Sequence, residues 1–224
     1  NNIFGKSAII YYASTPECLK MILELLPENQ RLEAVTSTDI YGNSTLMYAR
    51  TNPESLKIIL DIYPPDQRLE AVTSTDIYGN STLMYACINP ESFRIILALY
   101  PTDRRLKALT EYDVCGETIL IKAAKNPESL RTIFEHLPKE LSLSALSEKD
   151  KYGKSVLMKI VNHPEILKMI LDLCRADQRL DAVTEIDNYG KSTLMYAVKN
   201  PDSLEMILEL LPQEQRLEAV TEKD

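Results

Sequence analysis

The stretch QRLEAVTSTDIYGNSTLMYA occurs twice in this chain, without a change, at residues 30–49 and 67–86. The six glycines also recur every 37 residues, and six of the prolines keep the same step. These residues are Gly5, Gly42, Gly79, Gly116, Gly153, Gly190, Pro16, Pro53, Pro90, Pro127, Pro164 and Pro201. A fixed period of this kind indicates small structural units that bury their apolar faces against one another. We therefore expect a single repeat domain over residues 1–224, with repeats at about 2–38, 39–75, 76–112, 113–149, 150–186 and 187–224.

Within the second repeat, a tight turn is expected first and a short helix after it. Asp39 and Gly42 bound the turn, because Asp bonds nearby backbone amides and Gly tolerates a positive φ. Ser44 is a suitable N-cap for a helix from about Thr45 to Arg50. The equivalent caps in the other repeats are Ser7, Ser81, Thr118, Ser155 and Ser192.

Two more helices are expected in each repeat. Asn52 and Pro53 are good residues for the start of a second helix, which would run to about Tyr63. The helix-forming run Arg68–Val72 predicts a short third helix. No segment alternates between apolar and polar residues for long, so little or no sheet is expected.

The repeat resembles that of the ankyrin family. The residues that carry the resemblance are Asp39, Gly42, Ser44, Leu46, Ala49, Leu56, Ile59 and Leu60. Thr45 and Met47 replace the family's Pro and His, and Pro53 replaces its inter-helix Gly. The repeat also has 37 residues instead of about 33, with the extra residues after the second helix. These departures argue against the family's β-hairpin fingers and for the Arg68–Val72 helix in their place.

The resemblance implies an all-α, curved solenoid of six ankyrin-like helical repeats with little or no β structure. It further implies a protein–protein interaction scaffold that binds its partner along the concave face and is not an enzyme. The alternative is a substrate-docking arm of a larger enzyme or effector whose catalytic domain lies outside this chain. Degenerate arrays of this kind look similar to those in effector proteins of intracellular bacteria, which would place the chain in the host cytosol.

Composition argues against several other classes of protein and of site. The net charge of −8 and the pI near 5.0 argue against nucleic acid as a partner. No apolar run is long enough for membrane insertion. The four cysteines form no metal-ligand or disulfide pattern, which predicts a reducing, cytoplasmic compartment. We expect no catalytic residue, no metal site and no cofactor, and the oligomeric state stays open.

One candidate binding surface is the outward face of the first helices. On a helical wheel Tyr48 lies about 160° from the buried Leu46, so it is expected to point outward. Its equivalents are Tyr11, Tyr85, Lys122, Lys159 and Tyr196. Exposed tyrosines in a stack would anchor a partner by combining apolar area with a polar tip. The alternative is that each ring packs on the turn of a neighbouring repeat.

The turns change character along the chain. The position after the turn aspartate holds Ile40, Ile77 and Val114, then Lys151 and Asn188. The position after the glycine becomes Lys154 and Lys191. With Lys122 and Lys159, these lysines predict a basic C-terminal half that suits an extended acidic or amphipathic partner segment. The alternative is ordinary solvated lysine.

An arginine recurs at the start of the third helix. Its copies are Arg31, Arg68, Arg105, Arg179 and Arg216, with Ser142 at the equivalent position in the fourth repeat. Because each lies near acidic residues of its own and adjoining repeats, we expect a ladder of salt bridges more than a phosphate site.

Overall fold

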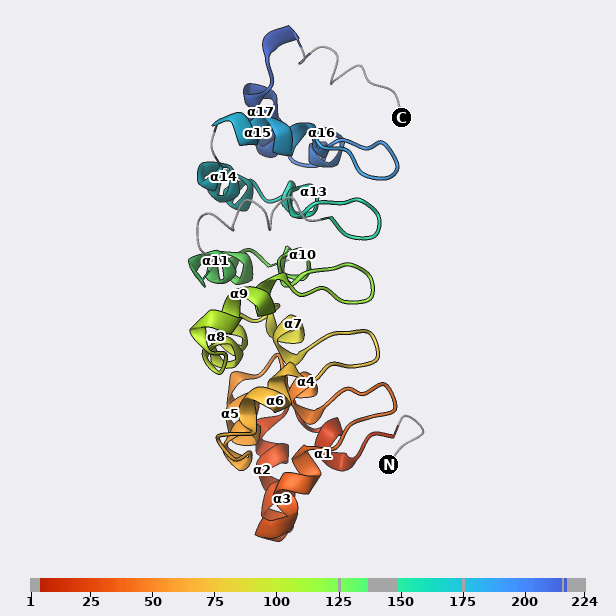
Figure 1. Cartoon of the computed structure of the whole chain (residues 1–224), viewed down its shortest axis with the longest axis vertical. Coiled ribbons are helices and arrows are strands. Elements are labelled where there is room, and N and C mark those ends of the chain that lie inside the picture. Colours follow the sequence, from red (N-terminus) through yellow and green to blue (C-terminus); the bar gives the residue numbers. More distant parts are fainter. Residues whose placement is uncertain (1–4, 125, 137–148, 175, 215, 217–224) are drawn as a thin grey trace. The chain divides into compact units, whose positions relative to one another are not determined.

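The computed structural model describes residues 5–124, 126–136, 149–174, 176–214 and 216. These residues fall into two compact units, Asn1–Val114 and Cys115–Asp224, which are described separately. The expectation of one domain over the whole chain stays a prediction. Figure 1 labels the helices, which have no strand beside them in the described ranges.

The N-terminal unit contains three successive sets of three helices. The first set is α1 (Ala8–Tyr11), α2 (Pro16–Leu25) and α3 (Glu28–Val35), and the second is α4 (Thr45–Ala49), α5 (Pro53–Ile62) and α6 (Arg68–Thr73). The third set is α7 (Thr82–Ala86), α8 (Pro90–Ala98) and α9 (Thr102–Thr110). The predicted helix order of short, long and third helix is therefore confirmed in each set.

The C-terminal unit repeats this order. Its helices are α10 (Ile119–Ala123), α11 (Pro127–His136), α13 (Val156–Ile160), α14 (Pro164–Leu173), α15 (Ala176–Thr184), α16 (Thr193–Ala197) and α17 (Pro201–Leu210). The third helix expected in the fourth repeat, with Ser142, lies outside the described residues. None of the helices that the structure describes has both the length and the apolar character to cross a membrane.

Helix starts follow the predicted caps. The side chain of Ser44 accepts a hydrogen bond from the Met47 amide at 3.3 Å, and the Asn52 side chain accepts one from the Ser55 amide at 2.9 Å. The predicted caps of the other first helices all accept the equivalent bond, namely Ser7, Ser81, Thr118, Ser155 and Ser192. Capping satisfies amides that the first turn leaves without partners, so these residues fix where each helix begins.

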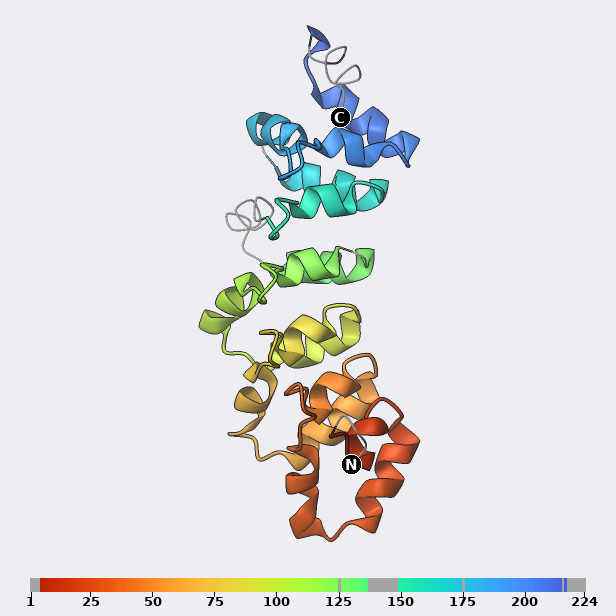
Figure 2. The ribbon, with the colours of Figure 1, turned by 90° about the vertical axis from the view of Figure 1, so that its right-hand side faces the viewer.

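The core of the N-terminal unit lies between successive helices. Figure 2 shows the helices of the unit lying above one another, and α5 contacts both α2 and α8. Leu56, Ile59 and Phe93 are fully buried in these contacts, as is Ala49 of the short helix α4. Each repeat therefore buries its apolar stripe against its neighbours, as expected of a solenoid.

The recurring arginine caps the C-terminal end of the second helix. Arg68 Nε donates to the Tyr63 carbonyl at 3.2 Å. The same bond joins Arg31 to Leu26, Arg105 to Tyr100, Arg179 to Cys174 and Arg216 to Leu211. Arg68 also pairs with Asp61 at 3.5 Å, within its own repeat. Arg179 likewise pairs with Asp172 at 3.9 Å. The predicted salt bridges therefore form within a repeat at these two arginines, while the contact that recurs at all five is to a carbonyl left open at a helix end.

Hairpin-like turns and third helices occur together. Thr38 and Ser44 form an isolated antiparallel bridge that closes the loop around Asp39–Gly42, and equivalent bridges occur at Thr75 and Ser81 and in the C-terminal unit. The expected third helix is therefore confirmed, without any strand in the described ranges, but it lies beside a turn closed by a single bridge instead of taking the place of that turn. The turn closes with the residues around Asp39, while the additional residues form α6.

Candidate partner-binding surface

Each turn is built around one aspartate. Asp39 Oδ1 accepts the amides of Tyr41 and Asn43, both at 2.9 Å, and Gly42 takes a φ of 78°. Asp76, Asp150 and Asp187 make the same pair of bonds in their own turns. The turn shape is thus fixed by local hydrogen bonds of the kind that aspartate forms with its following amides.

Successive turns are joined by their backbones. In the N-terminal unit the Ile77 amide donates to the Tyr41 carbonyl at 3.0 Å, and the Val114 amide donates to the Tyr78 carbonyl at 3.0 Å. A side chain on Gly42 would touch Asp76, since its Cβ would lie 3.4 Å from the Asp76 Cα. The turns are therefore held in register and at close approach, one per repeat.

These turns present apolar side chains to solvent. Ile40 and Ile77 are each 60% exposed and Val114 is 68% exposed, which is unusual for such residues. We call Ile40, Ile77 and Val114 the tip row. Because the turns beneath them are joined by backbone hydrogen bonds, the tip row is ordered before any partner arrives.

The corresponding position in the C-terminal unit is polar. Lys151 is exposed, and its ammonium lies 5.1 Å from the centre of the Tyr152 ring. Asn188 Nδ2 donates to the Lys151 carbonyl at 3.1 Å. Lys191, on the last turn, is also exposed. The change from apolar to polar turns that the sequence indicates is thus present at the surface of this unit.

The tyrosines of the first helices are not fully exposed. Tyr48, Tyr85 and Tyr196 are half-buried, and their hydroxyls donate to the Oδ2 of Asp39, Asp76 and Asp187 at 2.7, 2.6 and 2.6 Å. These three tyrosines are therefore less exposed than expected, and their role in binding a partner stays a prediction. Tyr11 is different, because it is 66% exposed and lies edge-on to Tyr12.

These hydrogen bonds shift the pKa of both the tyrosine hydroxyl and the aspartate carboxyl. Burial raises the pKa of Tyr48, and its bond to Asp39 adds to the rise. Burial alone would raise the pKa of Asp39, but hydrogen bonds from Tyr48, Asn43 and Tyr41 together outweigh it and hold that pKa below its usual value. The carboxylate is therefore stabilised in its charged form by the turn that it organises.

A second contact joins each of these tyrosines to the preceding turn. The Lys6 ammonium lies 4.4 Å from the centre of the Tyr48 ring, and the Lys154 ammonium lies 4.8 Å from that of Tyr196. The Tyr85 hydroxyl lies 3.4 Å from Asn43 Oδ1. Each pair is 42 residues apart, one repeat plus five residues. This contact is not evident from a single repeat, although the fixed separation of 42 residues is a signal for it.

Lysine replaces tyrosine in the fifth repeat and keeps both contacts. Lys159 Nζ lies 2.8 Å from Asp150 Oδ2 and 2.7 Å from Glu117 Oε1. Lys122 Nζ lies 3.5 Å from the other oxygen of Glu117. The predicted basic surface is therefore reduced, because Lys122 and Lys159 are paired with carboxylates and only Lys151 and Lys191 of that set lie exposed at turns.

The one histidine whose side chain the structure describes lies at the start of a helix. His163 precedes α14 without a side-chain cap bond, while the side chain of His136 lies outside the described part. Among the residues that the structure describes, no group of three or more His, Cys, Asp or Glu could hold a metal ion.

Comparison with known proteins gives similarity in structure and none in sequence. No protein-family model and no curated protein matches the chain. An ankyrin repeat domain from Acinetobacter baumannii aligns with a TM-score of 0.58 at 17% identity, covering 90% of this chain and 96% of that one. A further ankyrin repeat protein aligns with a TM-score of 0.60 at 18% identity, covering 93% and 98%.

A third similar structure comes from a complex. It is a chain in the complex of a predatory endopeptidase from Bdellovibrio bacteriovorus with an immunity protein. It aligns with a TM-score of 0.61 at 15% identity, covering 92% of this chain and 98% of that one. At these identities the alignments establish the fold of the repeats.

Proposed function

We propose that this chain, which has the ankyrin-repeat fold, is a protein-binding scaffold whose tip row Ile40, Ile77 and Val114 contacts the partner. The observation that carries the proposal is the exposure of these three apolar side chains on turns joined by hydrogen bonds. Covering an exposed apolar row is favourable by about 25 cal/mol per Å². Because the turns are already ordered, little conformational entropy opposes binding.

The spacing of the row favours an extended partner segment. Packed helices lie roughly 8–10 Å apart, so successive tips are separated by about that distance. A polyproline II segment advances about 3.1 Å per residue with three residues per turn, so every third residue faces the same side and meets a new tip. We propose a partner segment with apolar side chains at that interval. On the C-terminal unit, taken by itself, the exposed Lys151 and Lys191 favour acidic residues in a contacting segment.

The half-buried residues have a lesser role in this proposal. These residues hold the turns in place. The hydroxyls of Tyr48, Tyr85 and Tyr196 bind turn aspartates, and the ammonium groups of Lys122 and Lys159 bind Glu117. Two further residues contribute to partner binding in this proposal. Tyr11 is an exposed aromatic anchor, and Lys154 acts through its contact with Tyr196. One structure of similar fold, a chain in the complex of an endopeptidase with an immunity protein, supports a protein as partner.

The test is affinity capture followed by a defined measurement. The intact chain captures a partner from lysate, and that purified partner is titrated against the triple variant I40S/I77S/V114S. We expect the variant to bind at least tenfold more weakly, since three apolar contacts are lost. The control carries I186S and V198S, which remove side chains 54% and 69% exposed elsewhere. Equal affinity of the triple variant and the intact chain would reject the tip row as the contact surface.

A further inference from the structure

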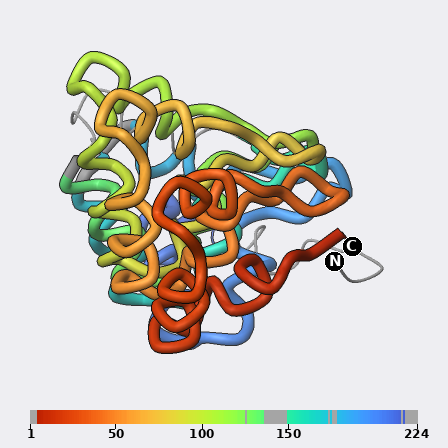
Figure 3. The backbone as a smooth tube through the Cα atoms, turned by 90° about the horizontal axis from the view of Figure 1, so that it is seen from below, coloured from red at the N-terminus to blue at the C-terminus, as the bar shows by residue number. Residues whose placement is uncertain are grey.

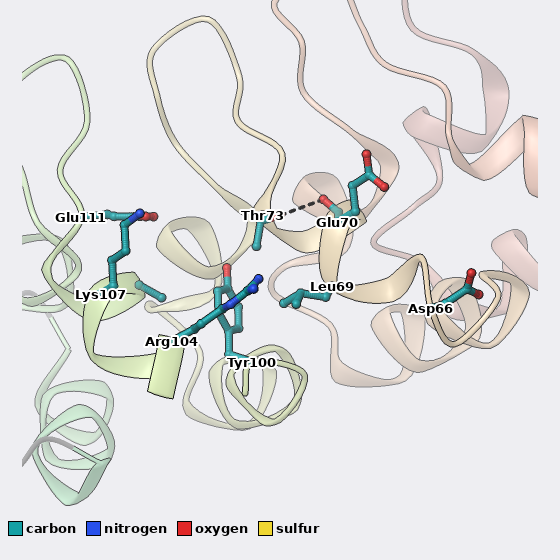
Figure 4. A pocket seen from close by; sticks show the side chains of 9 residues that line it. Asp66, Leu69, Glu70, Thr73, Tyr100, Arg104, Lys107 and Glu111 are labelled. Carbon is teal, nitrogen blue, oxygen red and sulfur yellow. Dashed lines mark hydrogen bonds between the residues drawn. The ribbon is translucent and has the colours of Figure 1, made fainter. Parts of the chain in front are cut away.

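A groove separates two successive third helices of the N-terminal unit. It has a volume of about 670 Å³ and lies between α6, with the residues just before it, and the helix α9 (Figure 4). Its floor is apolar, being formed by Leu69, Tyr100 and Ala108, of which Tyr100 and Ala108 are buried. In Figure 3 the turns extend to one side of the chain trace, and the third helices of this unit lie away from them. The groove is therefore separate from the tip row.

Both walls of the groove show helical spacing. The wall on the α6 side consists of Asp66, Leu69, Glu70 and Thr73, and the wall on the α9 side consists of Arg104, Lys107, Ala108 and Glu111. Leu69, Glu70 and Thr73 lie within α6, and Arg104, Lys107 and Ala108 lie on one face of α9. Asp66 precedes α6 and Glu111 follows α9. Two such faces on either side of an apolar floor match the way in which proteins hold an amphipathic helix in a groove.

The walls carry opposite charges over most of their length. Asp66 and Glu70 are exposed on one wall, while Arg104 and Lys107 are exposed on the other. In Figure 4 the Arg104 side chain extends over the floor beside Tyr100 and Leu69, while Lys107 extends toward Glu111. The basic wall therefore offers Arg104 as its most available cation.

This basic wall is peculiar to the third repeat. The position of Arg104 holds glutamine in four of the other repeats and leucine in one, at Gln30, Gln67, Leu141, Gln178 and Gln215. The position of Lys107 holds an acidic residue in four and serine in one, at Glu33, Glu70, Ser144, Asp181 and Glu218. Packing of the scaffold thus has no need of either cation, since the other repeats do without them.

From this geometry we infer that the α6–α9 groove is a second docking site, which takes an amphipathic helix of a partner protein. The apolar stripe of that helix packs on Leu69, Tyr100 and Ala108. One flank carries carboxylates toward Arg104 and Lys107, and the other carries ammonium groups toward Asp66 and Glu70. Flanking charges of this kind select partners in helix association. The site goes beyond the proposed function, which concerns the tip row alone.

The experiment uses two labelled helical peptides and the full chain, with binding measured by fluorescence anisotropy. Both peptides carry the same leucine stripe. The first has glutamates on one flank and lysines on the other, and the second has lysines on both flanks. We expect the intact chain to bind the first roughly fivefold more tightly, because two charge pairs replace two repulsions. The variant R104E/K107E makes both walls acidic and should reverse the preference.

Controls separate the groove from general charge effects. K168E/K199E changes the net charge by the same amount on exposed residues of the other unit and should keep the preference of the intact chain. I40S/I77S/V114S should also bind both peptides unchanged, whatever becomes of the tip-row proposal. The inference is overturned if neither peptide binds, if the intact chain does not prefer the first peptide, or if R104E/K107E keeps the preference. Reversal by K168E/K199E would overturn it as well.

Discussion

The hydroxyl of Tyr48 donates a 2.7 Å hydrogen bond to Oδ2 of Asp39, the aspartate that organises the turn of the same repeat. Tyr85 and Tyr196 repeat this bond to their own aspartates, and Lys159 replaces it with a 2.8 Å ion pair to Asp150. A donor on the first helix therefore fixes each of these turns. This bond explains why tyrosine and lysine can alternate at one position of the repeat.

Removing the donor should weaken the fold measurably. In Tyr48→Phe the ring stays half-buried but Asp39 Oδ2 loses a partner, so we expect a loss of about 1 kcal/mol in the free energy of unfolding. Urea denaturation followed by circular dichroism measures it. Tyr11→Phe is the control, because Tyr11 is 66% exposed, and it should leave stability unchanged. Equal midpoints for Tyr48→Phe and the intact chain would show that the bond contributes nothing.

Acid should remove the contribution of the turn aspartates. The folded-state pKa values of Asp39, Asp150 and Asp187 are held low, since their hydrogen bonds outweigh the effect of burial. A lowered carboxyl pKa stabilises the fold above the unfolded pKa, near 3.9, and the contribution is lost as pH falls through the folded value. Asp39→Asn should therefore be less stable than the intact chain at pH 7, with a gap that narrows below about pH 4. Thermal melts of both proteins from pH 7 to pH 3 test this, and a constant gap would contradict it.

Features that depend on local chemistry could be predicted from the sequence. Ser44 and Asn52 cap helices because each side chain bonds an amide three residues on, and the glycine turn is set by its own aspartate. The helical wheel also placed Tyr48 away from the core correctly, but it gives only the direction of Cβ. Whether the ring then continues into solvent or folds back onto Asp39 is decided by partners that the wheel does not contain.

Contacts between repeats are harder to predict from the sequence. Lys159 looks like a solvated lysine in the sequence, and its partner Glu117 lies 42 residues earlier. The same separation joins Lys6 to Tyr48 and Lys154 to Tyr196, so the repeat period carried the information. From the sequence, the hairpin turn and the α6 helix look like alternatives, because the repeat has only one set of extra residues to account for. In the fold they use different residues.

The contact between Glu117 and Lys159 should be replaceable by the pair found in the second and third repeats. Lys159→Tyr alone puts a tyrosine beside a glutamate, whereas adding Glu117→Asn rebuilds the pairing of Asn43 with Tyr85. We expect the double variant to lose less free energy of unfolding than the two single variants lose together, with a coupling of about 1 kcal/mol. Urea denaturation of all four proteins gives this coupling. Strict additivity would mean that the two positions do not interact.

The turn glycines offer a comparison between two positions with the same backbone but different surroundings. Gly153 and Gly190 have φ values of 78° and 77°, so alanine costs each about 1–2 kcal/mol for the left-handed conformation. At Gly190 none of the described residues lies within 4 Å of an added Cβ, but at Gly153 the Cβ would lie 2.7 Å from the Asn188 amide nitrogen. Gly153→Ala must therefore also push the next turn away and strain the 3.0 Å bond from the Asn188 amide to the Tyr152 carbonyl. We expect it to lower the free energy of unfolding by more than Gly190→Ala, as measured by urea denaturation. If the two variants lose the same stability, the close approach of successive turns does not contribute to holding the repeats together.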